Sequence, residues 1–206
     1  MERELLVTGI GGQGVQLATQ VLARALTLEN KYVLSLGTYG GTMRGGSTDA
    51  SLVYGDRAIS SPPIVASAWS GIALHHRFWE GTRIRLRPQA ILIVNRPIFD
   101  ADIDLSGFNA YGVPAIEIAT AQGSALGAAI VLVAAYAGLT GAVGLDALAA
   151  AMEQSLPSYR RKHLDTNIAA LKAGHAHFPP LCHPAWEVAT WEMSAREMAS
   201  DMTAVA

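Results

Sequence analysis

The amino-acid sequence predicts an α/β protein, a three-layer α/β/α domain built around a mostly parallel or mixed sheet. A short apolar run at residues 5–7 leads into a glycine-rich turn, and an amphipathic helical pattern follows it at once. Further short apolar runs fill the first half, whereas helical spacing dominates the C-terminal half. The 206 residues suffice for one compact domain and are short for two. We therefore expect one domain over residues 1–178 and a C-terminal tail over residues 179–206, which carries Trp186 and Trp191 and packs on the domain or on a partner subunit.

The expected strands are short apolar runs between turn residues, and the expected helices carry apolar residues at three- and four-residue spacing. The strands are at 5–7, 31–36, 49–55, 89–95 and 113–119. The helices begin directly after the glycine turn and then at 126–139, 146–156 and 161–172. The first strand, turn, helix and second strand span about thirty residues, the length that a parallel crossover needs.

Composition excludes several classes of protein. The net charge is -2 and no long basic run is present, so we do not expect binding to nucleic acid. Arg83, Arg85 and Arg87 form a short basic cluster, which we interpret as a solvated face. Cys182 is the only cysteine, so the chain alone can form neither a disulfide nor a cluster with four cysteine ligands. The N-terminus lacks the pattern of a signal peptide, and we expect a cytoplasmic protein.

Residues 118–145 contain no charged side chain and are long enough to cross a membrane. The stretch is rich in Ala and Gly, it includes polar residues, and no basic residue or aromatic belt flanks it. We expect a buried helix here. His175, His177, Cys182 and His183 match no usual zinc spacing, so no metal site is predicted.

The glycine turn, residues 9–14, satisfies the pattern G-x-G-x-x-G. Such a turn lets an anion approach the backbone N–H groups at a helix N-terminus. In nicotinamide-binding folds the second strand ends in an acidic residue, but here it ends in Ser35-Leu36-Gly37, and Glu29 precedes it. The turn therefore indicates a phosphate group or a close backbone contact, not NAD bound in the usual way.

A second glycine cluster brackets Arg44, with Gly40-Gly41 before it and Gly45-Gly46 after it. Ser47 and Thr48 come next, just before a predicted strand. A guanidinium between flexible segments, beside hydroxyl groups, is suited to binding an anion. The alternative is a glycine-rich turn in which Arg44 pairs with Asp49 or Asp56.

The two clusters together resemble a known family. "GIGGQGVQLATQVLARAL", "YGGTMRGGSTDASLVYGD" and "ISSPP", in this order, are similar to the gamma subunit of the 2-oxoacid:acceptor oxidoreductases, which act on pyruvate, 2-oxoglutarate, indolepyruvate or phenylglyoxylate. "LDTNIAALKAG" extends the resemblance to about Gly174. The resemblance implies a heteromeric complex that decarboxylates a 2-oxoacid oxidatively on thiamine diphosphate. It passes the electrons through [4Fe-4S] clusters, and most members transfer the acyl group to coenzyme A (CoA).

The resemblance also implies how the work is divided. Thiamine diphosphate and Mg are expected on the alpha and beta subunits, and the clusters on a ferredoxin-like delta subunit. Where NAD rather than ferredoxin is the acceptor, a flavin-bearing NAD-reducing subunit is expected as well. This chain would have no catalytic residue of its own and would bind CoA while helping to assemble the complex. The residues implied for CoA are Gly11, Gly12, Gln13 and Gly14 at the pyrophosphate, Arg44 toward the phosphates, and Gly45, Gly46, Ser47 and Thr48 in the supporting loop.

One departure from the family leaves alternatives open. Members often carry an Asn in the segment that matches "GSALGAAIVLVAAYAG", where this chain has Ser124 and Ala129 at the expected positions. The chain is then either a CoA-binding gamma subunit or a structural subunit of a CoA-independent branch. A stand-alone module that binds CoA or a nucleotide is the third reading.

Overall fold

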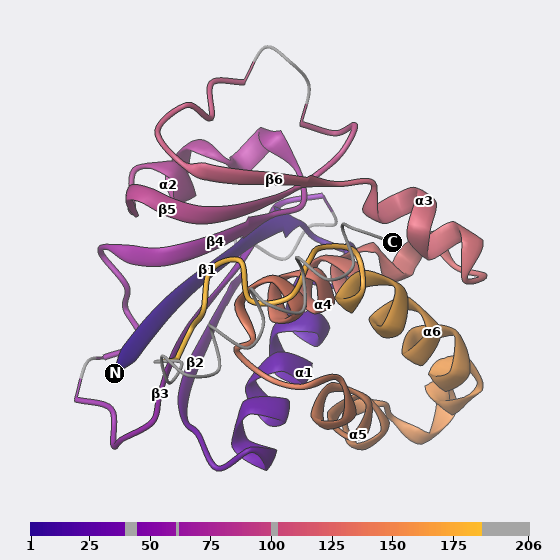
Figure 1. Ribbon diagram of the computed structural model, residues 1–206. Helices are drawn as coiled ribbons and strands as arrows, with labels where there is room; N and C mark the ends of the chain where they lie inside the picture. Colours follow the sequence, from indigo (N-terminus) through magenta and orange to yellow (C-terminus); the bar gives the residue numbers. More distant parts are fainter. Residues whose placement is uncertain (40–44, 61, 100–102, 187–206) are drawn as a thin grey trace, which may run out of the picture.

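The computed structural model describes residues 1–39, 45–60, 62–99 and 103–186, and its centre is a six-stranded mixed sheet (Figure 1). The strands lie in the order β2-β3-β1-β4-β5-β6. β3 pairs antiparallel with both β2 and β1, whereas β1, β4, β5 and β6 are parallel neighbours. The strands are β1 (Glu2–Ile10), β2 (Tyr32–Tyr39), β3 (Ser47–Gly55), β4 (Ala68–Ala73), β5 (Leu86–Asn95) and β6 (Asn109–Val113).

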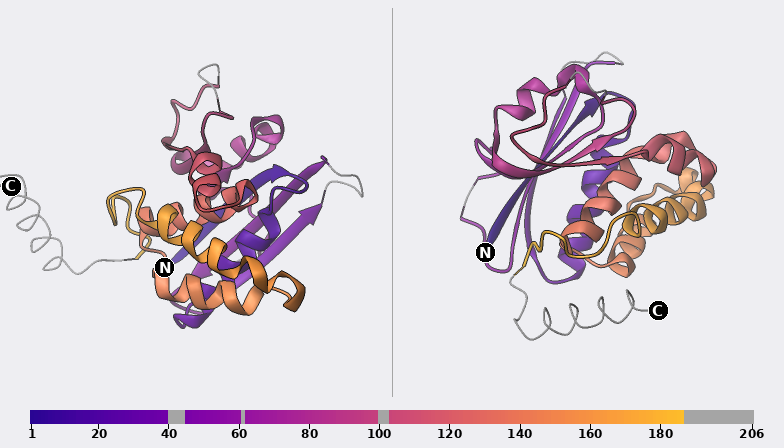
Figure 2. Two further views of the ribbon diagram at one scale, coloured as in Figure 1. Left: turned by 90° about the vertical axis from the view of Figure 1, so that its right-hand side faces the viewer. Right: turned by 45° about the horizontal axis from the view of Figure 1, so that its top comes forward.

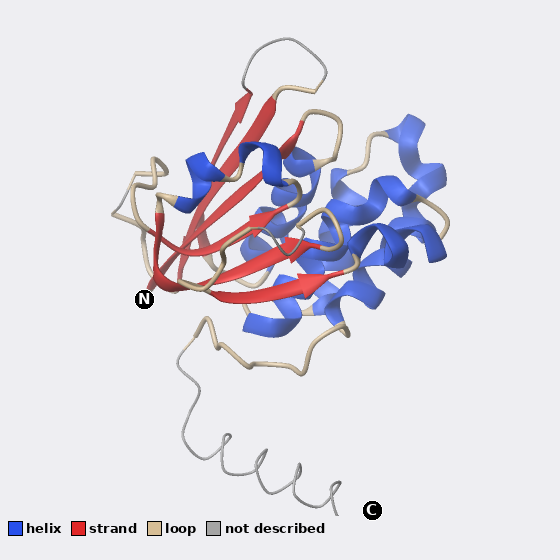
Figure 3. Ribbon diagram, turned by 90° about the horizontal axis from the view of Figure 1, so that it is seen from above, coloured by secondary structure: helices blue, strands red, loops and turns tan. Residues whose placement is uncertain are grey.

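The helices lie unevenly on the two faces of this sheet (Figures 2 and 3). The longer helices gather on one side, which we call the first face, and the short α2 with its preceding 3₁₀ turn lies on the second face. The predicted α/β fold with a mixed sheet is therefore confirmed. The helices are α1 (Val15–Leu28), α2 (Glu80–Arg83), α3 (Ala115–Ala121), α4 (Ala128–Thr140), α5 (Leu145–Ser155) and α6 (Leu164–His175); the 3₁₀ helices are η1 (His76–Phe78), η2 (Ala125–Gly127) and η3 (Ser158–His163).

Alternation along the strands divides the apolar residues between two cores. Leu5 and Val7 pack under α1 and α4 on the first face, whereas Leu6 belongs to the second-face core around Trp79. The second-face core is closed by loop residues rather than by long helices, with Phe99 in edge-to-face contact with the Trp79 ring. The long helices, and therefore their N-termini, lie on the first face.

α4 is the buried centre of the helical layer. All of its residues are buried, as the uncharged stretch predicts, and among the described residues no helix is long and apolar enough to cross a membrane. The Tyr136 hydroxyl contacts the Tyr54 hydroxyl at 2.5 Å and the Ser70 hydroxyl at 3.0 Å, which ties α4 to two strands. Burial raises the pKa of Tyr136 to about 12 and the pKa of Tyr54 well above its ordinary value.

Two expectations need correction. The predicted strand at 113–119 is wrong: β6 ends at Val113, and α3 begins just after Pro114, whose carbonyl accepts the Ile118 N–H. Proline has no N–H to give to a sheet and favours a helix start, so the alternation of "VPAIEIA" was misleading. The predicted parallel crossover is present, because α1 connects β1 to β2 and these two strands run parallel. They are not hydrogen-bonded neighbours, however, since β3 lies between them. β4 was not predicted at all.

After α6 the chain returns across the end of α4. Leu181, His183 and Ala185 donate backbone N–H groups to carbonyls of residues 138–140. Trp186 then donates its ring N–H to the Ala142 carbonyl at 3.0 Å. The boundary at residue 178 stays a prediction, and Trp191 lies outside the described residues.

Candidate ligand-binding cleft

The glycine turn between β1 and α1 is closed by its own hydrogen bonds. The Gln13 side-chain oxygen accepts the Ile10 N–H at 2.8 Å, and the Gln13 N–H donates to the Ile10 carbonyl at 3.0 Å. A Cβ on Gly9 would lie 2.8 Å from Val15 Cγ2, so only glycine fits there. Gly12 and Gly14 have φ angles of 103° and 82°, which side chains rarely adopt. The turn is thus held in one shape that needs these glycines.

This turn leaves the N-terminus of α1 open. Gly14 is the N-cap residue, no side chain caps the helix, and its first turn contains no acidic residue. The first N–H groups of a helix have no partner within the helix, and the helix dipole favours an anion beside them. A negatively charged ligand can therefore take the place that a capping side chain takes elsewhere.

The second glycine cluster packs against the first. The Gly11 N–H donates to the Gly46 carbonyl at 2.9 Å, and a Cβ on Gly11 would lie 3.5 Å from Thr48 Oγ1. The Asp49 carboxylate accepts hydrogen bonds from the hydroxyls of Thr8 and Ser47, at 2.7 and 2.9 Å. Both carboxylate oxygens of Asp49 therefore accept a hydrogen bond. Residues 45–48 pack behind the glycine turn and support it.

A cleft of about 500 Å³ opens beside the glycine turn on the helical side. Of the four residues predicted for the pyrophosphate, Gly12 and Gly14 line it, together with Leu17 of α1. Gly11 and Gln13 do not line it, and neither do Gly45, Gly46, Ser47 and Thr48. Arg44 lies outside the described residues, so its predicted role stays a prediction.

The start of α4 forms the floor of this cleft, through Ser124, Leu126, Gly127 and Ile130. α4, like α1, has a glycine N-cap without a capping side chain, and its first turn has no acidic residue. The Cβ position of Gly14 is 3.8 Å from the Ala129 Cβ, so the two helix starts are close neighbours. The open N-terminus of α1 therefore lies beside the start of α4, where η2 runs directly into the helix and the Gly127 N–H already donates to the Ser124 carbonyl.

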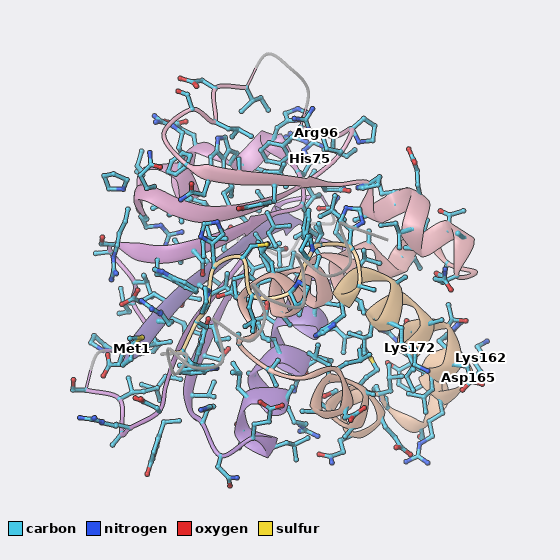
Figure 4. The ribbon with its side chains drawn as sticks, viewed as in Figure 1. Met1, His75, Arg96, Lys162, Asp165 and Lys172 are labelled. Atoms are coloured by element: carbon cyan, nitrogen blue, oxygen red, sulfur yellow. The ribbon has the colours of Figure 1, made fainter. Side chains whose placement is uncertain are left out.

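The opposite wall comes from η3 and α6. Arg160, His163, Thr166 and Asn167 line the cleft here, with Leu156 beside them. η3 carries four consecutive basic residues, and Arg160 forms no ion pair with any described residue. Figure 4 shows Lys162 and Asp165 at the outer end of this wall, and neither lines the cleft. Arg160 is thus an arginine that the described structure brings to the same cleft as the open N-terminus of α1.

Sequence reasoning missed this second wall. The run "RRKH" at 160–163 was the available signal for a basic wall. "LDTNIAALKAG" was noted only as family-like, yet it supplies an Asn to the cleft through Asn167. Of the two positions at which an Asn was expected, Ser124 lines the cleft, whereas Ala129 is buried beneath it.

Other predicted features are explained by local contacts. Glu29 caps the end of α1 and accepts the Gly144 N–H at 2.8 Å, so it holds the start of α5. Arg83 pairs with Glu80 and Arg87 with Glu4, while Arg85 donates to the Gly81 carbonyl. The interpretation of the arginine cluster as a surface face is supported by these pairs.

Comparison with known proteins adds an independent result. The sequence profile described as "Pyruvate ferredoxin/flavodoxin oxidoreductase" matches residues 4–177. The 2-oxoglutarate synthase subunit KorC of Methanothermobacter marburgensis is 30% identical, over 84% of this chain and 95% of that protein. These matches confirm the resemblance that the two glycine clusters carry.

Two solved structures have a similar fold. The pyruvate oxidoreductase subunit PORC of Thermotoga maritima has a TM-score of 0.66 and 25% identity, over 84% of this chain and 95% of that one. The 2-oxoglutarate:ferredoxin oxidoreductase of Magnetococcus marinus has a TM-score of 0.76 and 18% identity. In the latter, this chain corresponds to 33% of a longer polypeptide and 91% of its own length is covered.

Proposed function

Because the chain belongs to the pyruvate ferredoxin/flavodoxin oxidoreductase family, we propose that it is the gamma subunit of a heteromeric 2-oxoacid oxidoreductase and that its cleft binds CoA. The match to a KorC subunit, over 84% of this chain and 95% of that protein, supports the gamma role. The Magnetococcus marinus structure is described with 2-oxoglutarate, CoA and succinyl-CoA bound, which supports a CoA-dependent reaction for its family.

The observation that carries the CoA assignment is the meeting of the open N-terminus of α1 with Arg160 at one cleft. Backbone N–H groups and a guanidinium are the groups that bind a pyrophosphate most effectively in proteins. The volume of about 500 Å³ falls within the ordinary range for small-molecule sites. Leu17, Leu126, Ile130 and Leu156 add an apolar surface along which the pantetheine arm of CoA would lie.

Each wall has a defined role in this proposal. The N–H groups around Gly12 and Gly14 would donate to the pyrophosphate, and Arg160 would neutralise it from the facing wall. Asn167 and Ser124 would bond polar groups of the ligand. CoA, when bound, supplies the thiol that takes the acyl group from the thiamine site. This chain orients the cofactor and limits where its thiol can reach.

The other cofactors fit partner subunits better than this chain. A single cysteine cannot ligate a [4Fe-4S] cluster. Among the described residues no group of three or more His, Cys, Asp or Glu is placed to hold a metal ion. We therefore propose that thiamine diphosphate, Mg and the clusters lie on alpha, beta and delta partners, with ferredoxin or NAD as the acceptor of the whole complex.

Calorimetric titration of CoA into the purified native assembly tests the CoA site. Arg160→Ala is expected to weaken binding about ten- to a hundredfold, because a charge-assisted contact to phosphate is lost. Arg161→Ala is the matched control, since Arg161 lies on the same 3₁₀ helix but does not line the cleft. Equal affinity for wild type and both variants, in complexes that stay assembled, would show that CoA does not bind in this cleft.

Purification of the native protein tests the gamma role separately. A gamma subunit is expected to copurify with larger subunits in a brown, cluster-containing complex. A colourless protein that is stable alone and still binds CoA would instead favour the stand-alone module. An assembled brown complex that does not bind CoA would favour the CoA-independent branch.

A further inference from the structure

β2 is an edge strand that lacks the features by which the edges of sheets are usually protected. Its eight residues, Tyr32–Tyr39, include no charged residue and no proline. Its antiparallel pairing with β3 runs through all eight residues without a bulge. Charged side chains, prolines, bulges and short length are the usual devices that stop an edge strand from pairing with another chain. No described residue pairs with the outer side of β2, so its backbone groups are free to bind a further strand.

The side chains of β2 show that this edge is also uncovered among the described residues. Residues 34–38 are all exposed. Leu34 pairs with Val53 of the second-face core, so Leu34 and its alternate neighbours, Tyr32 and Leu36, lie on the second face. These three side chains are 38%, 53% and 42% exposed, respectively. Large apolar side chains therefore lie beside an unpaired backbone.

The one basic residue that adjoins β2 does not protect the edge. Lys31 directly precedes the strand, but its ammonium lies 4.1 Å from the centre of the Trp186 ring. Trp186 packs on the first-face core, where its ring contacts the Tyr54 ring edge-to-face at 5.6 Å. The positive charge of Lys31 is thus directed toward the helical layer and away from the open side of the strand.

The two edges of the sheet differ in a way that favours pairing of β2 with itself. The other edge strand, β6, has only five residues, and Pro114 follows it directly. Pairing of β2 with β6 of another molecule would be a head-to-tail contact, which produces a ring or an open filament. Pairing of β2 with β2 is closed, because it uses the long edge of both molecules. A second copy of this chain is therefore the partner that this edge fits.

The symmetry of such a pair limits its register. A twofold axis perpendicular to the sheet makes the two β2 strands antiparallel, and residues directly opposite each other then lie on the same face. The axis must therefore pass through a residue and not between two residues. An axis at Ser35 overlaps residues 32–38 and places Leu34 opposite Leu36 of the second copy. Every side chain in this overlap is uncharged, so no like charges repel the second copy.

We propose that two copies of this chain associate by antiparallel pairing of β2 with β2, with the twofold axis at Ser35. The pair joins the two sheets into one and gives the outer backbone groups of both strands hydrogen-bond partners. It also brings Leu34 of each copy against Leu36 of the other. The lining of the cleft contains no residue of β2, so the association is independent of CoA.

Disulfide formation in the native assembly tests both the partner and the register. In a Cys182→Ser background, Ser35→Cys and Thr38→Cys are made separately and oxidised with diamide; both positions are exposed on β2. At the axis the Cα atoms of the two copies of position 35 would be about 4.5–5.5 Å apart, a distance that a disulfide spans. The two copies of position 38 would be about 20 Å apart, because each faces position 32 of the other copy.

We therefore expect a disulfide between two copies of this chain for Ser35→Cys and little for Thr38→Cys. Disulfides at both positions, at neither position, or from position 35 to a different subunit overturn the proposal. The result does not depend on whether the cleft binds CoA, so the titration of CoA can fail while this test succeeds, and the reverse.

A charge introduced into the strand gives a second readout. Leu34→Lys, added to the Ser35→Cys chain, removes the Leu34–Leu36 contact on both sides of the axis. The protein concentration needed for half-maximal cross-linking between copies should therefore rise about tenfold. Tyr159→Lys is the matched control, because Tyr159 is 71% exposed but lies on η3 in the helical layer, and this change should leave that concentration unaltered. The same concentration in the presence of either lysine contradicts the proposal.

Discussion

The two walls of the cleft are built from different kinds of structure. The glycine-turn wall continues the sheet and presents backbone groups, and its shape depends on φ angles that only glycine adopts readily. The η3–α6 wall belongs to the helical layer and presents side chains, of which Arg160 and Asn167 are central to the proposed site. α4 lies between them, touching Gly14 of one wall and packing along α6 of the other. Substitutions in α4 should therefore affect both walls. Substitutions within the η3–α6 wall should lower ligand affinity with little effect on the free energy of unfolding.

The largest effect is expected where α4 meets α6. A Cβ on Gly138 would clash with the His175 carbonyl oxygen, a backbone atom that lies 2.2 Å from its position. Gly138→Ala should therefore push the helices apart and lower the free energy of unfolding by about 3 kcal/mol, which corresponds to a Tm lowered by roughly 6–12 °C. Thermal unfolding measures this. Gly107→Ala is the control, because a Cβ there meets no atom within 4 Å, and a similar loss in both variants would contradict the packing described.

The next effect concerns the contact of α4 with the sheet. Tyr136→Phe leaves the buried Tyr54 hydroxyl without its partner on α4, so we expect the free energy of unfolding to fall by about 2 kcal/mol. Tyr54→Phe/Tyr136→Phe should cost less than the sum of the single changes, because both partners of that hydrogen bond are removed together. Denaturant unfolding of the three variants measures the difference, and additive losses would contradict the pairing.

The same pair predicts a dependence on alkaline pH. The pKa of Tyr136 is raised from 10.0 to about 12 in the folded protein, so the fold holds the phenolic proton more tightly than the unfolded chain does. This stabilisation is complete below about pH 10 and is lost as the pH rises from about 10 toward about 12. Unfolding curves across this range should therefore show falling stability, less steeply in the double phenylalanine variant. Equal slopes in wild type and variant would show that the tyrosines are not responsible.

A smaller effect on stability is expected in the glycine turn, and the smallest at Arg160. Gly12→Ala meets no atom within 4 Å but must adopt a φ of 103°, which should cost about 1–2 kcal/mol. Because the change also reorients N–H groups at the proposed pyrophosphate site, CoA affinity should fall together with Tm. Arg160→Ala should lower the affinity while changing the unfolding free energy by less than about 0.5 kcal/mol. A normal CoA affinity in Gly12→Ala would exclude the turn from the site.

The same contrast explains what the sequence could predict. The glycine turn and α1 were predictable because a strand, a turn and a helical stripe lie within about 25 consecutive residues. The wall formed by Arg160 and Asn167 was not, because only the packing of α6 on α4 brings residue 160 to residue 12. Likewise, β3 lies between β1 and β2 through long-range pairing, and "VPAIEIA" reads as a strand until Pro114 is placed at a helix start.

Hydrogen exchange of the native assembly with and without CoA tests the central claim most directly, since it reports on both walls at once. The account predicts that CoA slows exchange at the backbone amides of residues 12–16 and 160–167 and leaves β2 unchanged. Protection confined to one wall, or found only on other subunits, would contradict a CoA site formed between the glycine turn and the η3–α6 wall.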